Sequence, residues 1–123
     1  MTSAEPAHIL VVEDSAALRE NLQEALELEG YRVTVAADGR RALEALAAEP
    51  RPGVVVADLM MPGMGGRELV ERIRAEPLLA GLRVVIATGH PSASVRAGIA
   101  ADAFLEKPFG VKELLAAIGG ETS

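Results

Sequence analysis

Two hydrophobic periods alternate along the whole chain, and this alternation constrains the fold more than any other feature. Apolar residues recur three and four positions apart in some segments, which is the spacing of one helical face. Between these segments lie short apolar runs of strand length, at Ile9 to Val12, Val33 to Ala36, Val54 to Ala57, Val84 to Ala87 and Ala103 to Leu105. Runs of this kind are typical of strands buried on both faces of a parallel sheet.

The helical patterns follow the strand candidates one by one. The four clear patterns are Leu18, Leu22, Ala25 and Leu26; Leu43, Leu46 and Ala47; Leu69, Val70 and Ile73; and Val111, Leu114, Leu115 and Ile118. The segment after His90 has only Val95 and Ile99, with Gly98 between them, so a short or mobile helix is predicted there. Gly30 and Pro77 mark helix ends, and Gly39 marks a helix start.

Five strand-helix units in a row predict an α/β fold. Short right-handed connections between them predict a doubly wound, five-stranded parallel sheet covered on both faces. In the flavodoxin-like (βα)5 arrangement, which we take for this sheet, the strand order is 2-1-3-4-5. A chain of 123 residues has room for one core. We therefore expect residues 1–123 to form a single domain with a core of about residues 8–119 and no output domain.

Charge and composition exclude several classes of protein. The 18 acidic residues outnumber the 12 basic ones, and the resulting charge of −6 disfavours nucleic acid and anionic membranes as partners. The chain has no cysteine, no apolar run long enough for a membrane span and no signal-peptide pattern at Met1 to Ala7. A cytoplasmic protein is expected.

Polar side chains with chemical potential follow the predicted strands. Glu13 and Asp14 come after the first strand, Asp58 after the third, Thr88 after the fourth and Lys107 after the fifth. In such sheets ligands bind beyond the carboxyl ends of the strands, at the point where strand order reverses. We expect the three acids to meet there, between the first and third strands.

Three carboxylates at close range repel one another unless a cation joins them. Oxygen ligands suit Mg²⁺, with Mn²⁺ as a second option, whereas the absence of cysteine and of a histidine cluster makes Zn²⁺ a poor fit. Asp14 and Asp58 are candidates for direct ligands, Glu13 for a ligand through water, and a carbonyl of the loop after Asp58 for a further position. Lys107 and Thr88 suit the oxygens of a phosphoryl group in transfer.

Four motifs give the chain a specific resemblance. In order, they are Val11-Val12-Glu13-Asp14, Asp58-Leu59-Met60-Met61-Pro62-Gly63-Met64-Gly65-Gly66, Ala87-Thr88-Gly89 and Lys107-Pro108-Phe109. Together they resemble the receiver domains of bacterial two-component response regulators, and single-domain, chemotaxis-regulator-like members in particular. The resemblance extends from about His8 to Gly119.

The resemblance implies a role for each motif. Asp58 takes a phosphoryl group from a phosphohistidine, and Asp14, Asp58 and the backbone carbonyl of Met60 hold Mg²⁺, with Glu13 as the second member of the acidic pair. Thr88 and Lys107 bind the phosphoryl oxygens, and the Lys107-Pro108 bond is cis. Thr88 and Phe104 are then the switch residues, which change the face made by the fourth helix, fifth strand and fifth helix.

The implied protein is a phosphorylated signalling switch in a phosphorelay rather than a metabolic enzyme, although it catalyses its own phosphoryl transfer and dephosphorylation. Its partners are a histidine kinase or histidine phosphotransferase and an unknown downstream protein, and it is a monomer or a weak homodimer. Two alternatives use the same residue types. One is an unphosphorylated docking or dimerisation receiver, and the other is a haloacid dehalogenase-type phosphohydrolase, which needs an acid where Met60 stands.

Several of these residues also have ordinary structural interpretations. Either Asp14 or Ser15 is a candidate helix cap, and Asp58 alone is a common turn residue. His8 and His90 have no partner histidines or cysteines in the sequence, so we expect both at the surface.

Overall fold

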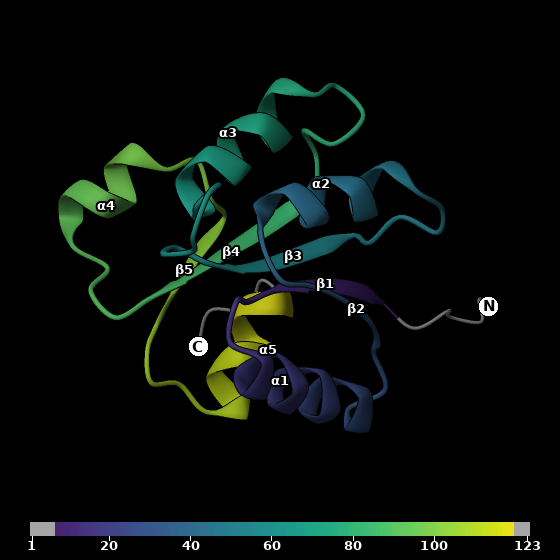
Figure 1. The fold of residues 1–123 in the computed structure, drawn as a ribbon. Helices are drawn as coiled ribbons and strands as arrows, with labels where there is room; N and C mark the ends of the chain where they lie inside the picture. Colours follow the sequence, from purple (N-terminus) through teal and green to yellow (C-terminus); the bar gives the residue numbers. More distant parts are fainter. Residues whose placement is uncertain (1–6, 120–123) are drawn as a thin grey trace.

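The computed structural model describes residues 7–119 and confirms the predicted sheet. Five parallel strands lie in the order β2-β1-β3-β4-β5 (Figure 1). The strands are β1 (His8–Val12), β2 (Arg32–Ala36), β3 (Val54–Asp58), β4 (Arg83–Thr88) and β5 (Ala103–Glu106). The helices that alternate with them are α1 (Ala16–Leu28), α2 (Gly39–Ala47), α3 (Gly66–Ala75), α4 (Ala93–Gly98) and α5 (Val111–Gly119). Residues 1–6 and 120–123 of the predicted domain lie outside the described part.

Helices cover both faces of the sheet. Figure 1 shows α1 and α5 together on one side and α2 and α3 on the other, with α4 beyond α3. Each side has its own apolar cluster, with Leu26, Leu114 and Ile118 in one and Leu46, Leu69 and Ile73 in the other. Burial of apolar surface between these helices and the sheet is the main stabilising term, and it fixes the carboxyl ends of the strands, where the polar residues lie.

Two predicted features of the strands require correction. Asp58 and Thr88 do not follow their strands but are the last residues of β3 and β4. Burial on both faces holds for the central strands β1, β3 and β4, whereas β2 is only partly buried because it lies at the edge of the sheet.

The weakest helix prediction is confirmed as a short helix. Helix α4 has six residues, and none of them is buried. Side chains of α3 hold its far end: Arg67 Nη1 donates to Gly98 O at 2.8 Å, and Arg74 Nε donates to Ala100 O at 2.9 Å. The position of α4 therefore depends on these polar contacts together with two apolar side chains, the partly buried Val95 and the buried C-cap residue Ile99.

Arg74 joins several loops at one guanidinium group. It also donates to the carbonyl oxygens of Ala80 and Leu82, at 2.9 and 2.7 Å, and pairs with the Asp102 carboxylate at 2.8 Å. Asp102 accepts a further hydrogen bond from Val84 N at 2.7 Å. These contacts hold together the connection that precedes β4 and the connection that precedes β5.

Capping side chains and a glycine determine where three helices begin beside the carboxyl ends of the strands. Ser15, rather than Asp14, caps α1 and accepts from Leu18 N at 3.3 Å, and Asp38 caps α2 and accepts from Arg41 N at 2.8 Å. Gly66 begins α3 against the backbone of β3, where a Cβ atom would lie 2.7 Å from Asp58 O. Glycine is required there because any side chain would displace the strand end that carries Asp58.

The surface prediction for His8 is wrong. His8 is half-buried, and its Nε2 lies 2.7 Å from Thr34 Oγ1 of the neighbouring strand. His90 is exposed, as predicted. Along residues 7–119, every helix is too short or too polar to cross a membrane.

Candidate functional site: an acidic pocket at the sheet switch point

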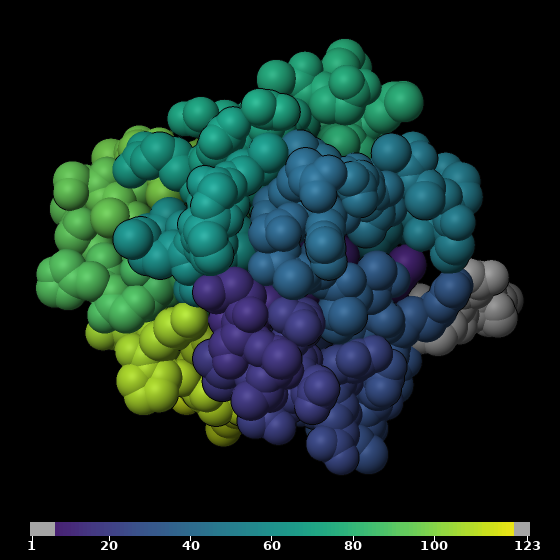
Figure 2. Space-filling view, viewed as in Figure 1, coloured from purple at the N-terminus to yellow at the C-terminus, as the bar shows by residue number. Residues whose placement is uncertain are grey.

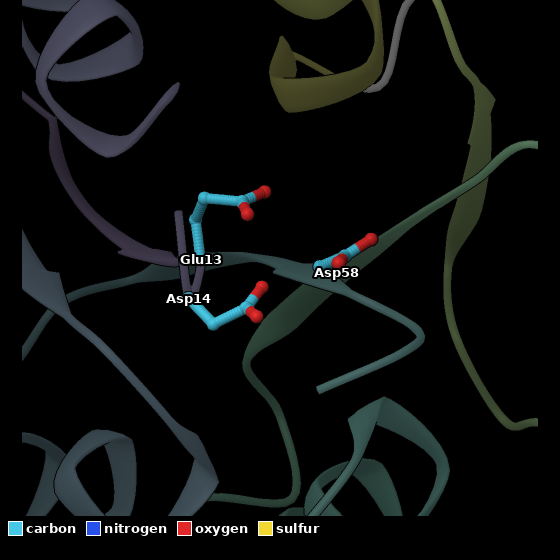
Figure 3. A group of neighbouring side chains, drawn as sticks. All are labelled: Glu13, Asp14 and Asp58. Carbon is cyan, nitrogen blue, oxygen red and sulfur yellow. The ribbon is translucent and has the colours of Figure 1, made fainter. Parts of the chain in front are cut away.

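Three carboxylates meet where β1 and β3 end side by side. The side chains of Glu13 and Asp14 leave the end of β1 on the side where Asp58 lies at the end of β3 (Figure 3). One carboxylate oxygen from each residue lies within 4.8 Å of the others. Glu13 is 5% exposed and Asp58 is 9% exposed, whereas Asp14 faces solvent. Oxygen donors at this spacing, one of them open to water, fit Mg²⁺.

Lys107, the residue directly after β5, brings a positive charge to the same place. Its Nζ lies 2.8 Å from Asp58 Oδ1 and 3.8 Å from Glu13 Oε1. Burial lowers the pKa of Lys107, but the hydrogen bond and charge of Asp58, with further charge from Glu13 and Asp14, outweigh this and raise the pKa overall. The ammonium is therefore protonated throughout the physiological range.

Glu13 is the most fixed of the acids. Its backbone N donates to Ala36 O at 3.0 Å, its backbone O accepts from Arg19 Nη1 at 2.8 Å, and its Oε2 accepts from Ser15 N at 3.0 Å. Burial raises the pKa of Glu13, and the charge of Asp58 adds to this, against the opposing effects of the Ser15 N–H and Lys107. A cation in the pocket would favour the ionised form of this carboxyl.

Thr88 lies one strand away from Asp58. Ala87 pairs with Asp58 across β3 and β4, and Thr88 is 7% exposed just beyond that pair. Its Oγ1 accepts from His90 N at 3.2 Å, and its backbone O accepts from Lys107 N at 2.9 Å. The last hydrogen bond joins Thr88 and Lys107 directly.

The remaining predicted residues surround this pocket. Met60 is 77% exposed in the loop after β3, and the Lys107–Pro108 peptide bond is cis, the geometry that the resemblance implies. Phe104 is half-buried in β5 and packs against the apolar cluster on the α2 and α3 side. The guanidinium carbon of Arg96, from α4, lies 5.4 Å from the centre of the Phe104 ring. That distance is within the range of a cation–π interaction.

An apolar pocket of about 550 Å³ opens beside the acids, between α1 and the segment after β5. Glu13 and Lys107 line one part of it, and the rest is mainly apolar, including Leu18, Phe109 and Val111. Figure 2 shows the purple surface of α1 against the yellow surface of the segment that leads into α5. An approaching molecule can therefore contact apolar surface and the acidic pocket together.

Sequence reasoning missed Arg19 and Arg96. Arg19 reaches back from α1 to the Glu13 carbonyl, and Arg96 reaches from α4 to Phe104. Neither belongs to one of the four motifs, and single arginines on exposed helices are common. The sequence indicates only that Arg19 lies shortly after the turn between the first strand and the first helix.

The fold and the acidic pocket define a flavodoxin-like α/β domain whose site suits Mg²⁺. The family model of the response regulator receiver domain matches residues 9–119, and the chain belongs to this family of two-component systems.

Individual relatives agree with this assignment. The response regulator MprA of Mycolicibacterium vanbaalenii is 43% identical over 114 residues, which are 90% of this chain and 48% of that protein. MprA of Mycobacterium ulcerans is 42% identical over 111 residues, 88% of this chain and 47% of that protein. The chain thus spans about half the length of these curated relatives.

Two solved structures of similar proteins match nearly the whole chain. The chemotaxis protein CheY4 of Vibrio cholerae has a TM-score of 0.89 at 30% identity, over 96% of this chain and all, 100%, of that one. A CheY-like receiver domain protein of Methanospirillum hungatei has a TM-score of 0.80 at 32% identity, over 94% of this chain and 93% of that one.

Proposed function

We propose that Asp58 accepts a phosphoryl group from a phosphohistidine of a histidine kinase or histidine phosphotransferase. The observation that carries this proposal is the contact of Asp58 Oδ1 with Lys107 Nζ at 2.8 Å, inside a cluster that also contains the carboxylates of Glu13 and Asp14. A nearly buried aspartate with a paired lysine and a cation pocket has what an acyl phosphate needs: a nucleophile and nearby positive charge.

The transfer forms one bond and breaks one. A carboxylate oxygen of Asp58 forms a bond to phosphorus while the bond between phosphorus and the donor imidazole nitrogen breaks, and its electron pair stays on that nitrogen. Bound Mg²⁺ would supply positive charge next to the phosphoryl oxygens. Asp14, Asp58 and the carbonyl of Met60 would hold it, with Glu13 acting through water.

Lys107 and Thr88 would receive the transferred group. The Lys107 ammonium is already beside Asp58, so it would neutralise charge on the phosphoryl oxygens, and the Thr88 hydroxyl would donate a hydrogen bond to one of them. Later, water attacks phosphorus and the Asp58 carboxylate leaves, which resets the domain.

The donor protein would approach over α1 and the segment that precedes α5. Glu13 and Lys107 help to line the apolar pocket between them, and Lys107 contacts Asp58, so a donor helix placed there would bring its imidazole near Asp58. Burial of apolar side chains such as Leu18 would provide affinity.

The phosphoryl group would change the face formed by α4, β5 and α5. It adds about −1.5 to −2 charge and three acceptor oxygens beside Thr88. Movement of Thr88 toward these oxygens would leave space for Phe104, whose ring contacts Arg96 of α4. Phosphorylation would thus bias a two-state surface that a downstream protein reads.

Intact-mass spectrometry tests the acceptor role directly. Acetyl phosphate with Mg²⁺ should add one hydroxylamine-sensitive phosphoryl group to the chain, and Asp58→Asn should add none. An unchanged mass for the unmodified sequence would overturn the proposal in favour of a domain that only docks or dimerises.

A further inference from the structure

Arg19 has a defined contact beside the acidic pocket but no role in the proposed transfer. It lies in the first turn of α1 and is half-buried. Its Nη1 donates to the backbone carbonyl of Glu13 at 2.8 Å, and its own backbone N donates to Ser15 O at 2.9 Å. The side chain therefore folds back from the helix onto the turn that precedes it.

This turn carries two of the three carboxylates. Glu13 N is held by Ala36 O, and the Glu13 carboxylate is held by Ser15 N. Within residues 7–119, Arg19 provides the hydrogen bond to the Glu13 carbonyl, which belongs to the peptide group that leads into Asp14. Among residues 7–119 Asp14 has no salt bridge, and its interaction with the Glu13 carboxyl is with a group on the same turn. The backbone of this turn therefore sets where the Asp14 Cβ atom points and which positions its carboxylate can reach.

We propose that Arg19 is a positioning residue for the divalent cation. By holding the Glu13 carbonyl it fixes the peptide plane between Glu13 and Asp14, and so directs the Asp14 carboxylate toward Asp58. It does this without contacting the cation. The inference rests on the proposed function, because it takes the acidic pocket as a Mg²⁺ site.

The charge of Arg19 and its hydrogen bond to Glu13 predict opposite changes in Mg²⁺ affinity when Arg19 is replaced. Loss of a positive charge beside an acidic pocket strengthens binding of a cation, since one repulsive interaction is removed. Loss of a hydrogen bond that orients a ligand weakens binding, because the ligands must then be ordered when the cation arrives. The sign of the change in Mg²⁺ affinity therefore distinguishes the two.

Calorimetric titration of Mg²⁺ without any phosphodonor measures that sign. Arg19→Met removes the donor and the charge but keeps a long apolar chain, and it should raise the dissociation constant about tenfold. Arg19→Lys keeps a donor and the charge and should recover most of the affinity. Arg40→Met is the matched control, because Arg40 lies on α2 and pairs only with Glu44, at 3.4 Å, among residues 7–119. Its dissociation constant should stay within about twofold of the parent.

Two measurements keep the test independent of folding. Thermal unfolding without Mg²⁺ shows whether Arg19→Met is folded. If it is not, Arg19→Gln takes its place, and the same weakening is expected because the shorter chain does not span the distance to the carbonyl. In the ¹⁵N spectrum of the cation-free chain, the largest shift outside residue 19 should fall on the amides of Asp14 and Ser15.

The outcomes separate this inference from the proposed function. Unchanged or tighter Mg²⁺ binding by Arg19→Met overturns the positioning role alone, as does equal weakening by Arg40→Met. If the parent chain binds no Mg²⁺, the proposed function fails, and this inference fails with it.

Discussion

The Lys107 ammonium lies 2.8 Å from Asp58 Oδ1 and joins the end of β5 to the end of β3 across the intervening strand β4. This contact places the positive charge beside the carboxylate that we propose as the nucleophile. Replacement of Lys107 should affect the chemistry with little effect on the core, because 31% of its side chain is exposed.

Lys107→Ala should slow phosphorylation by acetyl phosphate on the order of 10²-fold, since one stabilising charge is lost from the transition state. The rate is measured at saturating Mg²⁺ from samples quenched at successive times and analysed by intact-mass spectrometry. The control is Lys112→Ala, on the exposed side of α5, which should keep the parent rate. Equal rates for the two variants would remove Lys107 from the mechanism.

Leu18→Glu should weaken phosphotransfer from a histidine kinase about tenfold, because a charge replaces apolar surface in the pocket beside the acids. Phosphorylation by acetyl phosphate should not change, since this small donor needs no docking surface. Leu28→Glu, at the far end of the same helix and 80% exposed, is the control. A loss with both donors would place the effect in the site rather than in docking.

Arg74→Ala should lower the free energy of unfolding by about 2–3 kcal/mol, because three loop carbonyls lose this donor and Asp102 loses its paired charge. Urea titration followed by circular dichroism gives the value. Arg72→Ala, two residues earlier on α3, loses an exposed pair with Glu68 as its one ion pair within residues 7–119, and it should change stability by less than about 0.5 kcal/mol. Similar losses for both would show that the Arg74 contacts contribute little.

Stability should depend on His8 below neutral pH. Burial, and then the charge of Arg32, lower the pKa of His8 in the folded chain. A lowered pKa means that the folded state disfavours the charged ring, so the contribution is complete above the unfolded pKa, about 6.5, and is lost as pH falls toward the folded pKa. Urea titrations at pH 8 and pH 5 should show a steeper loss for the parent than for His8→Gln. Replacement of the exposed His90 should leave the pH dependence as it is.

Arg96→Gln should favour the phosphorylated form of the α4, β5 and α5 face. The guanidinium contact with the Phe104 ring is worth about 0.5–1 kcal/mol, and its loss frees the ring to move. Side-chain NMR signals of Phe104 should shift when beryllofluoride binds, and the variant should begin part of the way along that shift. Signals that stay in place on beryllofluoride addition would make Phe104 an ordinary core residue.

The sequence was sufficient for the strands, the helices and the residues at the carboxyl ends of the strands, whereas the strand order was taken from the flavodoxin-like arrangement. Alternating periods identify each strand and helix, and the rule for parallel sheets brings Glu13, Asp14 and Asp58 together without any coordinates. The strand ends were misplaced by one residue at Asp58 and Thr88, because a polar residue that ends a strand reads like the start of a loop.

Contacts between distant side chains could not be read from patterns. The half-buried state of His8 depends on Thr34 of the adjacent strand, and the interaction of Arg96 with Phe104 depends on the path of a short helix without buried residues. Periodicity reports which face of an element is apolar. It carries no information about which long polar side chain bends back to a particular carbonyl or ring.

The backbone hydrogen bond from Lys107 N to Thr88 O, at 2.9 Å, has a mechanical consequence. Thr88 ends β4 and Lys107 directly follows β5, so the backbones of these two residues cannot move apart without breaking this bond. A shift of the Thr88 backbone would therefore be passed to the peptide that leads into α5, so the phosphoryl group that we propose at Asp58 would displace two strand ends together.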